Sequence, residues 1–206
     1  MNTIILANGA FPQSDKLLSL LDTAERIICC DGAVNSLVDS GREPSVIIGD
    51  LDSVNSGIRL KYKDRLVKVL NQDTNDLTKA VNWCVENGIK EITILGATGK
   101  REDHAIGNIS LLAQYSKVIS VKLFTDYGVF ISVSKTTVFD TFKGQQVSIF
   151  SLDTSLKITS TGLKYPLKDH KLTSWWMGTL NESEGESFSV ILNGAGDVIV
   201  YLLDEV

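Results

Sequence analysis

The sequence predicts an α/β protein with an N-terminal Rossmann-like parallel sheet domain and a C-terminal antiparallel β-sandwich. Up to about residue 127, short β-branched runs alternate with helical patterns, which is typical of a parallel sheet with helical crossovers. Those runs are apolar throughout, as in strands that are covered on both faces. After about residue 128 only strand-like runs with short polar breaks follow. We therefore expect domains at 1–127 and 128–206.

The first part contains the clearest helix of the sequence, at residues 74–88. Its apolar positions recur at helical spacing, Thr74 or Asn75 can cap its start, and Gly88 suits its end. The expected apolar stripe is Leu77, Ala80, Val81, Cys84 and Val85. Further helices are expected at 14–24, 33–41 and 102–114, and strands at 3–7, 26–30, 45–49, 65–70, 91–97 and 117–126.

The second part is expected to consist of strands joined by short turns. The segment NGAG at 193–196 lies between two strand-like runs and favours a hairpin. Trp175 and Trp176 are adjacent, so in a strand they would point to opposite faces. The expected strands are 129–134, 136–142, 145–152, 156–161, 187–193 and 197–203.

Composition excludes several classes of protein. The chain has 206 residues, a net charge of −5 and 43% hydrophobic residues, which are values of an ordinary globular protein. Scattered basic residues disfavour nucleic-acid binding, and no apolar run is long enough for a membrane span. The N-terminus lacks the pattern of a signal peptide, so we expect a cytoplasmic protein. With two histidines and no CxxC, a zinc site is not expected, and the adjacent Cys29 and Cys30 suit a buried apolar run.

Acidic residues come directly after several of the expected strands, at the edge of the sheet that the carboxyl ends of parallel strands share. Asp31 follows the second strand, Asp50 and Asp52 follow the third, and Asp76 begins the helix after the fourth. Two carboxylates ~5 Å apart repel by roughly 3 kcal/mol at an effective dielectric near ~20, so the pair needs either a solvated turn or a cation. Any one of these aspartates could serve only as a turn or cap residue. Together they favour a Mg²⁺ site.

The segment GATGKREDH supplies positive charge at the same edge. Gly96 and Gly99 allow a ligand to approach the backbone, and Lys100 and Arg101 suit phosphate oxygens. The segment is too short for a Walker A loop, and the chain has no GxGxxG. Asp103 is expected to be a helix cap, a partner that orients the arginine, or a proton acceptor.

Five segments together resemble the thiamine pyrophosphokinase (thiamine diphosphokinase) family, and the likeness covers essentially the whole chain. They are DGA at 31–33, GDLDS at 49–53, QDTNDLTKA at 72–80, GATGKREDHAIGN at 96–108, and GLKYPL followed by GTLNES. The resemblance implies a homodimer with its active sites at the subunit interface. It also implies transfer of the pyrophosphoryl group of ATP to the hydroxyethyl alcohol of thiamine, leaving AMP.

The resemblance also implies roles for individual residues. Mg²⁺ and the triphosphate would lie among Asp50, Asp52 and Asp76, and the catalytic set would be Asp52, Gln72 and Asp76. ATP contacts are expected from Asp31, Lys100, Arg101 and Asp103. Thiamine contacts are expected from Asn75, Trp176, Thr179, Asn181 and Glu182, although both tryptophans could instead serve the core and the dimer interface. The chain has Asn75 where the family commonly has threonine and Leu180 where a serine is usual.

Other functions are compatible with parts of this pattern. A pyrophosphokinase for another heterocyclic alcohol, such as a hydroxymethylpterin, would use the same acidic edge. A metal-dependent nucleotide-sugar transferase shares only the short DxD pattern of Asp50-Leu51-Asp52. A non-catalytic sensor of nucleotide or thiamine would bind without forming AMP, and would not need the full acidic set.

Overall fold

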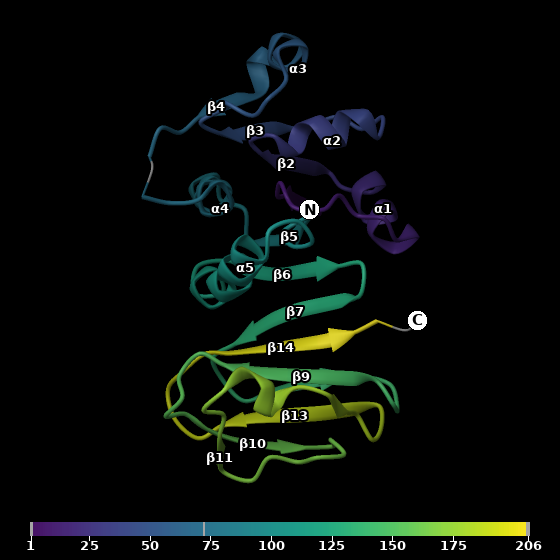
Figure 1. Ribbon diagram of the computed structural model, residues 1–206, viewed down its shortest axis with the longest axis vertical. Helices are drawn as coiled ribbons and strands as arrows, with labels where there is room; N and C mark the ends of the chain where they lie inside the picture. The colour runs from purple at the N-terminus through teal and green to yellow at the C-terminus, as the bar shows by residue number, and fades with distance from the viewer. Residues whose placement is uncertain (1, 72, 205–206) are drawn as a thin grey trace. The chain divides into compact units, whose positions relative to one another are not determined.

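The computed structural model describes residues 2–71 and 73–204 (Figure 1). It divides into two compact units, one made of residues up to 111 with 117–126, the other of residues 112–116 with those from 127 onward. The first unit has a parallel sheet with helices, and the second has antiparallel sheets. The predicted fold class is therefore confirmed.

The sheet of the first unit is wholly parallel, with the strand order β6-β5-β1-β2-β3-β4. Chain order runs outward from β1 in both directions, so the topological switch point lies between β1 and β5. Ligands of open parallel sheets bind at such a point, beyond the carboxyl ends of the strands. The strands are β1 (Thr3–Leu6), β2 (Arg26–Cys30), β3 (Val46–Gly49), β4 (Leu66–Lys68), β5 (Glu91–Leu95) and β6 (Ser120–Thr125).

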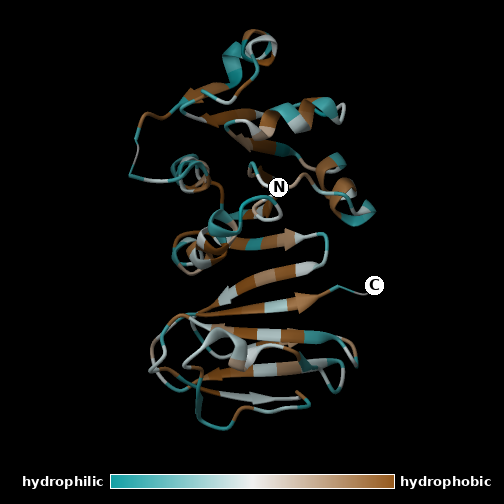
Figure 2. Ribbon diagram, viewed as in Figure 1, coloured by the Kyte–Doolittle hydropathy of each residue, from teal (hydrophilic) through white to brown (hydrophobic). Residues whose placement is uncertain are grey.

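Helices bury both faces of this sheet. Leu17 of α1 and Leu37 of α2 join one core cluster with alternate strand residues such as Ile4 and Ile47. Helix α4 contacts β1, β2 and β3 and buries its own apolar face. Figure 2 shows the resulting contrast between hydrophobic strands and helices of mixed hydropathy. The helices are α1 (Asp15–Asp22), α2 (Ala33–Asp39), α3 (Ser56–Lys61), η1 (Lys63–Arg65), α4 (Asp76–Glu86) and α5 (Glu102–Tyr115).

Asp126, at the end of β6, caps helix α1 from a distant part of the chain. One of its oxygens accepts hydrogen bonds from the backbone N–H groups of Gln13 and Ser14, both at 2.8 Å. The side chain of Ser14, the N-cap residue, makes no cap bond of its own. A carboxylate at this end of a helix also interacts favourably with the helix dipole.

Two details of the first unit differ from the sequence-based expectation. Helix α3 and the short η1 were not predicted, because they have no buried residues and hence no apolar periodicity to detect. Val85, expected on the buried stripe of α4, is 37% exposed, whereas Leu77, Ala80, Val81 and Cys84 are buried as predicted. Gly88 has a φ of +73° just after α4 and ends the helix as predicted.

The second unit contains two antiparallel sheets with the orders β12-β9-β14-β7 and β11-β10-β13-β8. Alternate residues such as Val147 and Ile149 in β9, and Phe188 and Val190 in β13, are buried, as the two inner faces of a sandwich require. The strands are β7 (Gly128–Val133), β8 (Thr137–Asp140), β9 (Gln146–Ser151), β10 (Lys157–Thr161), β11 (His170–Lys171), β12 (Asn181–Glu182), β13 (Ser187–Leu192) and β14 (Val198–Leu203).

One prediction for this unit is wrong, and the condition on which another depended is not met. The NGAG segment does not close a hairpin, because β13 pairs with β10 and β8 while β14 pairs with β7 and β9. The segment instead joins the two sheets, which a turn signal alone does not distinguish from a hairpin. Trp175 and Trp176 lie in a 3₁₀ helix, η2 (Trp175–Gly178), and not in a strand. Gly178 packs so closely on the backbone of Ile149 that a Cβ atom there would clash.

The three cysteines are buried free thiols, as expected for small apolar side chains. Burial raises the pKa of the Cys84 thiol to about 12. Within residues 2–71 and 73–204, no helix is long and apolar enough to cross a membrane.

Candidate active site

A cavity of about 490 Å³ lies in the first unit at the carboxyl ends of its strands. Its walls come from the ends of β1, β2, β3 and β5 and from the N-terminal parts of α4 and α5. It is therefore located at the topological switch point of the sheet, where ligands of this fold class bind. Its polar lining includes Asp31, Asp50, Asp52, Asn75, Asp76, Lys79, Lys100 and Arg101.

Three carboxylates meet in this cavity. Asp31, Asp50 and Asp52 each place an oxygen within 4.8 Å of the others. Asp31 is only 5% exposed, and its Oδ1 is buried without a hydrogen-bond partner among the described residues. Burial raises the pKa of Asp31, the nearby polar groups of Ser53 and Gly32 lower it, and the neighbouring carboxylates of Asp76 and Asp50 raise it further. Hard oxygen ligands in such an arrangement, one of them unsatisfied, fit a Mg²⁺ ion.

Unusual backbone conformations bring these carboxylates together. Asp31 and Leu51 have φ values of +43° and +71°, which non-glycine residues rarely adopt. A Cβ atom on Gly49 would lie 2.8 Å from the Cβ of Asp31, so only glycine lets β3 approach Asp31 this closely. The Asp52 N–H donates to Asp50 Oδ1 at 3.2 Å and closes the turn around Leu51. Strain of this kind is concentrated at functional sites.

Asp76 lies at the start of α4 and lines the same cavity, but it is paired with a lysine. Lys79, one helical turn later, donates from Nζ to Asp76 Oδ1 at 2.8 Å. The sequence did not predict a role for Lys79, because apolar spacing identifies the helix but not the polar residues on its buried face. The detectable signal was a lysine beside the expected buried stripe and three residues after an aspartate of the acidic edge. Gln72, predicted to be catalytic, lies outside the described residues.

Asn75, predicted to bind substrate, caps α4 and links it to α5. Its Oδ1 accepts from the Thr78 N–H at 2.8 Å, and its Nδ2 donates to Asn108 Oδ1 at 3.3 Å. Asn108 in turn donates to the carbonyl of Ala97 at 2.8 Å. Asn108 is a second cavity residue that sequence analysis did not assign. These bonds fix the start of α4 against the glycine-rich segment after β5.

The glycine-rich segment closes the side of the cavity opposite the carboxylates of β2 and β3. The N–H of Gly9, after β1, donates to the carbonyl of Gly96 at 2.6 Å, a close approach that a Cβ on Gly9 would block. Lys100 Nζ donates to the carbonyl of Asn8 at 3.2 Å, which holds the lysine beside the carboxyl end of β1. These contacts join the two strand ends on either side of the switch point.

Arg101 and Asp103 form a two-pronged ion pair. Arg101 donates from Nη2 to Asp103 Oδ2 at 2.6 Å and from Nε to Oδ1 at 3.1 Å. These bonds and the N–H of His104 lower the pKa of Asp103 to about 2. Arg101 lines the cavity and Asp103 does not. Of the three roles considered for Asp103, this geometry favours orientation of the arginine, because so weak a base is a poor proton acceptor.

The second unit has a separate cavity of about 670 Å³. Thr179 and Asn181, predicted to bind substrate, line it together with Tyr165 and Met177. The Asn181 side chain accepts from the Tyr165 N–H at 3.1 Å and donates to the Tyr165 carbonyl at 2.7 Å, so it supports this wall. Glu182 does not line the cavity and pairs with Lys164 at 3.1 Å.

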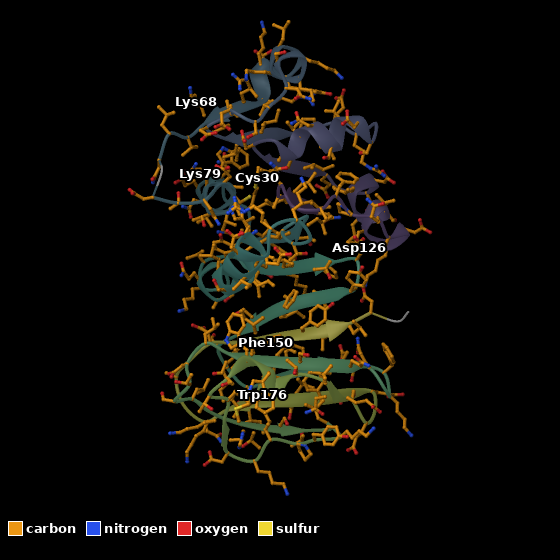
Figure 3. The ribbon with its side chains drawn as sticks, in the orientation of Figure 1. Cys30, Lys68, Lys79, Asp126, Phe150 and Trp176 are labelled. Atoms are coloured by element: carbon orange, nitrogen blue, oxygen red, sulfur yellow. The ribbon has the colours of Figure 1, made fainter. Side chains whose placement is uncertain are left out.

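The two tryptophans of η2 have different surroundings, and Figure 3 labels Trp176. Trp175 packs edge-on against Phe150, with ring centroids 5.9 Å apart. Trp176 is 75% exposed and does not line the cavity of the second unit. Leu180, at the cavity wall, is 78% exposed and has a φ of +59°, a strained conformation for leucine. This stretch therefore offers apolar surface that the chain itself does not bury.

Comparison with known proteins gives the family. Models of the thiamin pyrophosphokinase catalytic domain and substrate-binding domain match residues 17–123 and 128–201. Thiamine pyrophosphokinase of Bacillus subtilis is 30% identical over 183 residues, covering 84% of this chain and 85% of that protein. Rice thiamine pyrophosphokinase 1 is 28% identical over 201 residues, covering 82% and 75%. The crystal structure of thiamine pyrophosphokinase from Bacillus subtilis superposes with a TM-score of 0.81 over 100% of both chains at 24% identity. The chain belongs to the thiamin pyrophosphokinase family.

Proposed function

We propose that this protein is a thiamine pyrophosphokinase that converts ATP and thiamine into AMP and thiamine diphosphate. The alcohol oxygen of thiamine forms a bond to the β-phosphorus of ATP, and the bond from that phosphorus to the α–β bridging oxygen breaks. The alcohol loses its proton, and AMP leaves with the electron pair of the broken bond. Family membership supports this reaction, and the buried, unsatisfied oxygen of Asp31 beside Asp50 and Asp52 is the observation that carries it.

The three clustered carboxylates are the residues that would hold Mg²⁺. Asp50 and Asp52 were predicted as ligands from the sequence, and Asp31 was placed in the same acidic group. An oxygen of Asp31 lies within 4.8 Å of theirs, and its buried Oδ1 has no hydrogen-bond partner among the described residues. Asp76, also predicted as a ligand, lines the same cavity but is paired with Lys79 and is not part of this group. When bound, Mg²⁺ supplies positive charge to the phosphate oxygens in the transition state.

The glycine-rich segment would bind the phosphates of ATP. Lys100 and Arg101 both line the cavity and carry the positive charge that the polyphosphate requires. Asp103 holds the guanidinium of Arg101 in one orientation through two hydrogen bonds, which reduces the entropy lost on binding. The start of α5 directly follows Arg101 and adds the favourable end of a helix dipole.

Thiamine would bind to the second unit. Its cavity of about 670 Å³ is lined by aromatic, thioether and hydroxyl groups, which suit a flat heterocycle. Trp176 does not line this cavity, but its exposed ring would be available to stack on the cationic thiazolium of thiamine. We further propose a homodimer, because Trp176 and Leu180 leave an uncovered apolar surface. Sedimentation of the purified protein tests this.

One assay tests the reaction. The protein is incubated with ATP, Mg²⁺ and thiamine, and AMP and thiamine diphosphate are measured together. We expect equal amounts of both products. Product from a hydroxymethylpterin but not from thiamine would move the assignment to another pyrophosphokinase, and tight binding of nucleotide or thiamine without AMP would indicate a sensor.

A variant of the acidic cluster tests the role of its carboxylates. We expect Asp52→Asn to keep the fold and to lower kcat by on the order of a hundredfold or more, because a group that stabilises the transition state is lost. The matched control is Asp64→Asn, which changes an exposed aspartate outside the cavity. Near-normal turnover of Asp52→Asn at limiting Mg²⁺ would contradict the proposed role.

A further inference from the structure

Lys79 is a buried cation in the wall of a cavity that otherwise gathers carboxylates. It is 7% exposed, and its Nζ lies 2.8 Å from Asp76 Oδ1 (Figure 3 shows its place beside Cys30). Lysine is almost never buried to this extent unless it is paired. The position of the charge in this cavity therefore needs an explanation beyond the packing of α4.

Helix stability does not supply that explanation. An exposed ion pair at i,i+3 stabilises a helix only slightly, and the helix already has a cap at Asn75. A buried ion pair is often no more stable than apolar residues of similar volume. Stability therefore does not explain why Lys79 is buried here, and we consider instead how its positive charge affects the neighbouring carboxylates.

Among the described residues, three of the four carboxylates in the cavity lie in one group, and the fourth is paired with a lysine. Asp31, Asp50 and Asp52 form a group whose oxygens all lie within 4.8 Å of one another, and Asp76 is not part of it. Instead, Asp76 is paired with Lys79 in the same cavity. Without the ammonium group, a fourth uncompensated carboxylate would face any cation that enters the cavity.

We propose that Lys79 is a positioning residue that keeps Asp76 out of the ligand set of the nucleotide-free site and limits the affinity of that site for a free divalent ion. The ion is then bound chiefly together with the polyphosphate, whose own oxygens complete its coordination. This inference rests on the proposed function, because it assumes that the cavity accepts Mg²⁺ and ATP.

Direct titration of the metal tests the inference without relying on turnover. Mn²⁺ or Mg²⁺ is titrated into the full chain by calorimetry, with and without a non-hydrolysable ATP analogue. We expect Lys79→Met to bind the free ion about tenfold more tightly or better, since an unpaired carboxylate attracts a nearby divalent ion strongly in a partly desolvated site. The gain in metal affinity caused by the nucleotide should shrink by a similar factor.

Two further variants complete a double-mutant cycle, and a third is the control. We expect Asp76→Asn to weaken binding of the free ion, and Asp76→Asn combined with Lys79→Met to return it to within about threefold of the parent. The double variant removes both charges together, so it leaves no unpaired buried charge to unfold the protein. Lys90→Met makes the same substitution at an exposed lysine outside the cavity and should change nothing.

Unchanged or weaker metal binding by Lys79→Met overturns the inference. So does a double variant that stays as weak as Asp76→Asn, because Asp76 would then be a direct ligand in the nucleotide-free site. Absence of AMP formation by the parent protein overturns the proposed function instead, and the metal titration is read independently of it.

Discussion

The replacement Asp31→Asn should stabilise the metal-free protein while it abolishes activity. Asp31 is buried, its Oδ1 accepts no hydrogen bond from a described residue, and oxygens of Asp50 and Asp52 lie within 4.8 Å. Two charges at that distance repel by roughly 3 kcal/mol at an effective dielectric near ~20 and by about 1 kcal/mol in water. Because the other two groups are partly solvated, we expect a gain of about 1–2 kcal/mol.

The backbone favours the same substitution. Asn tolerates the left-handed conformation that Asp31 adopts, with its φ of +43°. A gain of about 1–2 kcal/mol in a chain of this size corresponds to a rise in Tm of about 2–8 °C. The gain should depend on pH. Because the pKa of Asp31 is raised in the folded state, its favourable contribution is complete below the unfolded pKa and is lost as the pH rises through the folded pKa.

Thermal melting of variant and parent at about pH 7.5 and at about pH 4 measures how the gain in stability depends on pH. Carboxyl groups are ordinarily ionised at the higher pH. The difference in Tm between variant and parent should be largest at the higher pH, and added Mg²⁺ should stabilise the parent more than the variant. Asp64→Asn, at an exposed position, is the control and should shift stability by less than about 0.5 kcal/mol. A lower Tm for Asp31→Asn, or equal stabilisation of both proteins by Mg²⁺, would refute the reasoning.

Two other predictions concern the backbone of the acidic turn and the surface of η2. Gly49→Ala should lower kcat at least about tenfold, because its Cβ would lie 2.8 Å from that of Asp31 and push the carboxylates apart, whereas Gly57→Ala has open space and should be neutral in a kinetic assay. Trp176→Ala should raise the KM for thiamine with little change in Tm, whereas Trp175→Ala should lower the Tm with little change in KM, because the Trp175 ring packs edge-on against Phe150 although 43% of the residue is exposed. Equal effects of the two tryptophan changes would contradict this separation.

Much of the first unit could be predicted because its strands and helices obey simple periodicities. The six parallel strands appear as β-branched runs such as VIIG, and α4 has a buried stripe, a cap and a terminal glycine that are all legible in the sequence. Helix α3 could not be predicted, since it has no fully buried residue and only Ile58 packs against the core. In the second unit, strand positions were predictable but sheet membership was not, because NGAG permits either a hairpin or a passage between sheets.

The site was predictable to the extent that residues at strand ends share one edge of the sheet. This rule brought Asp31, Asp50 and Asp52 together, and the structure places their oxygens side by side. It could not find Lys79 or Asn108, because both lie inside helices and their role depends on which face points into the cavity. Nor could it show that Asn181 is occupied by hydrogen bonds to the backbone of Tyr165.

The capping of α1 by Asp126 has a consequence for how the chain acquires its structure. The two hydrogen bonds span 113 and 112 residues, so helix α1 lacks its cap until β6 and Asp126 have been synthesised. Contacts so distant in sequence slow folding, because a long loop must close before they can form. Helix α1 is therefore synthesised early and capped late, and a truncation before residue 126 would leave it frayed.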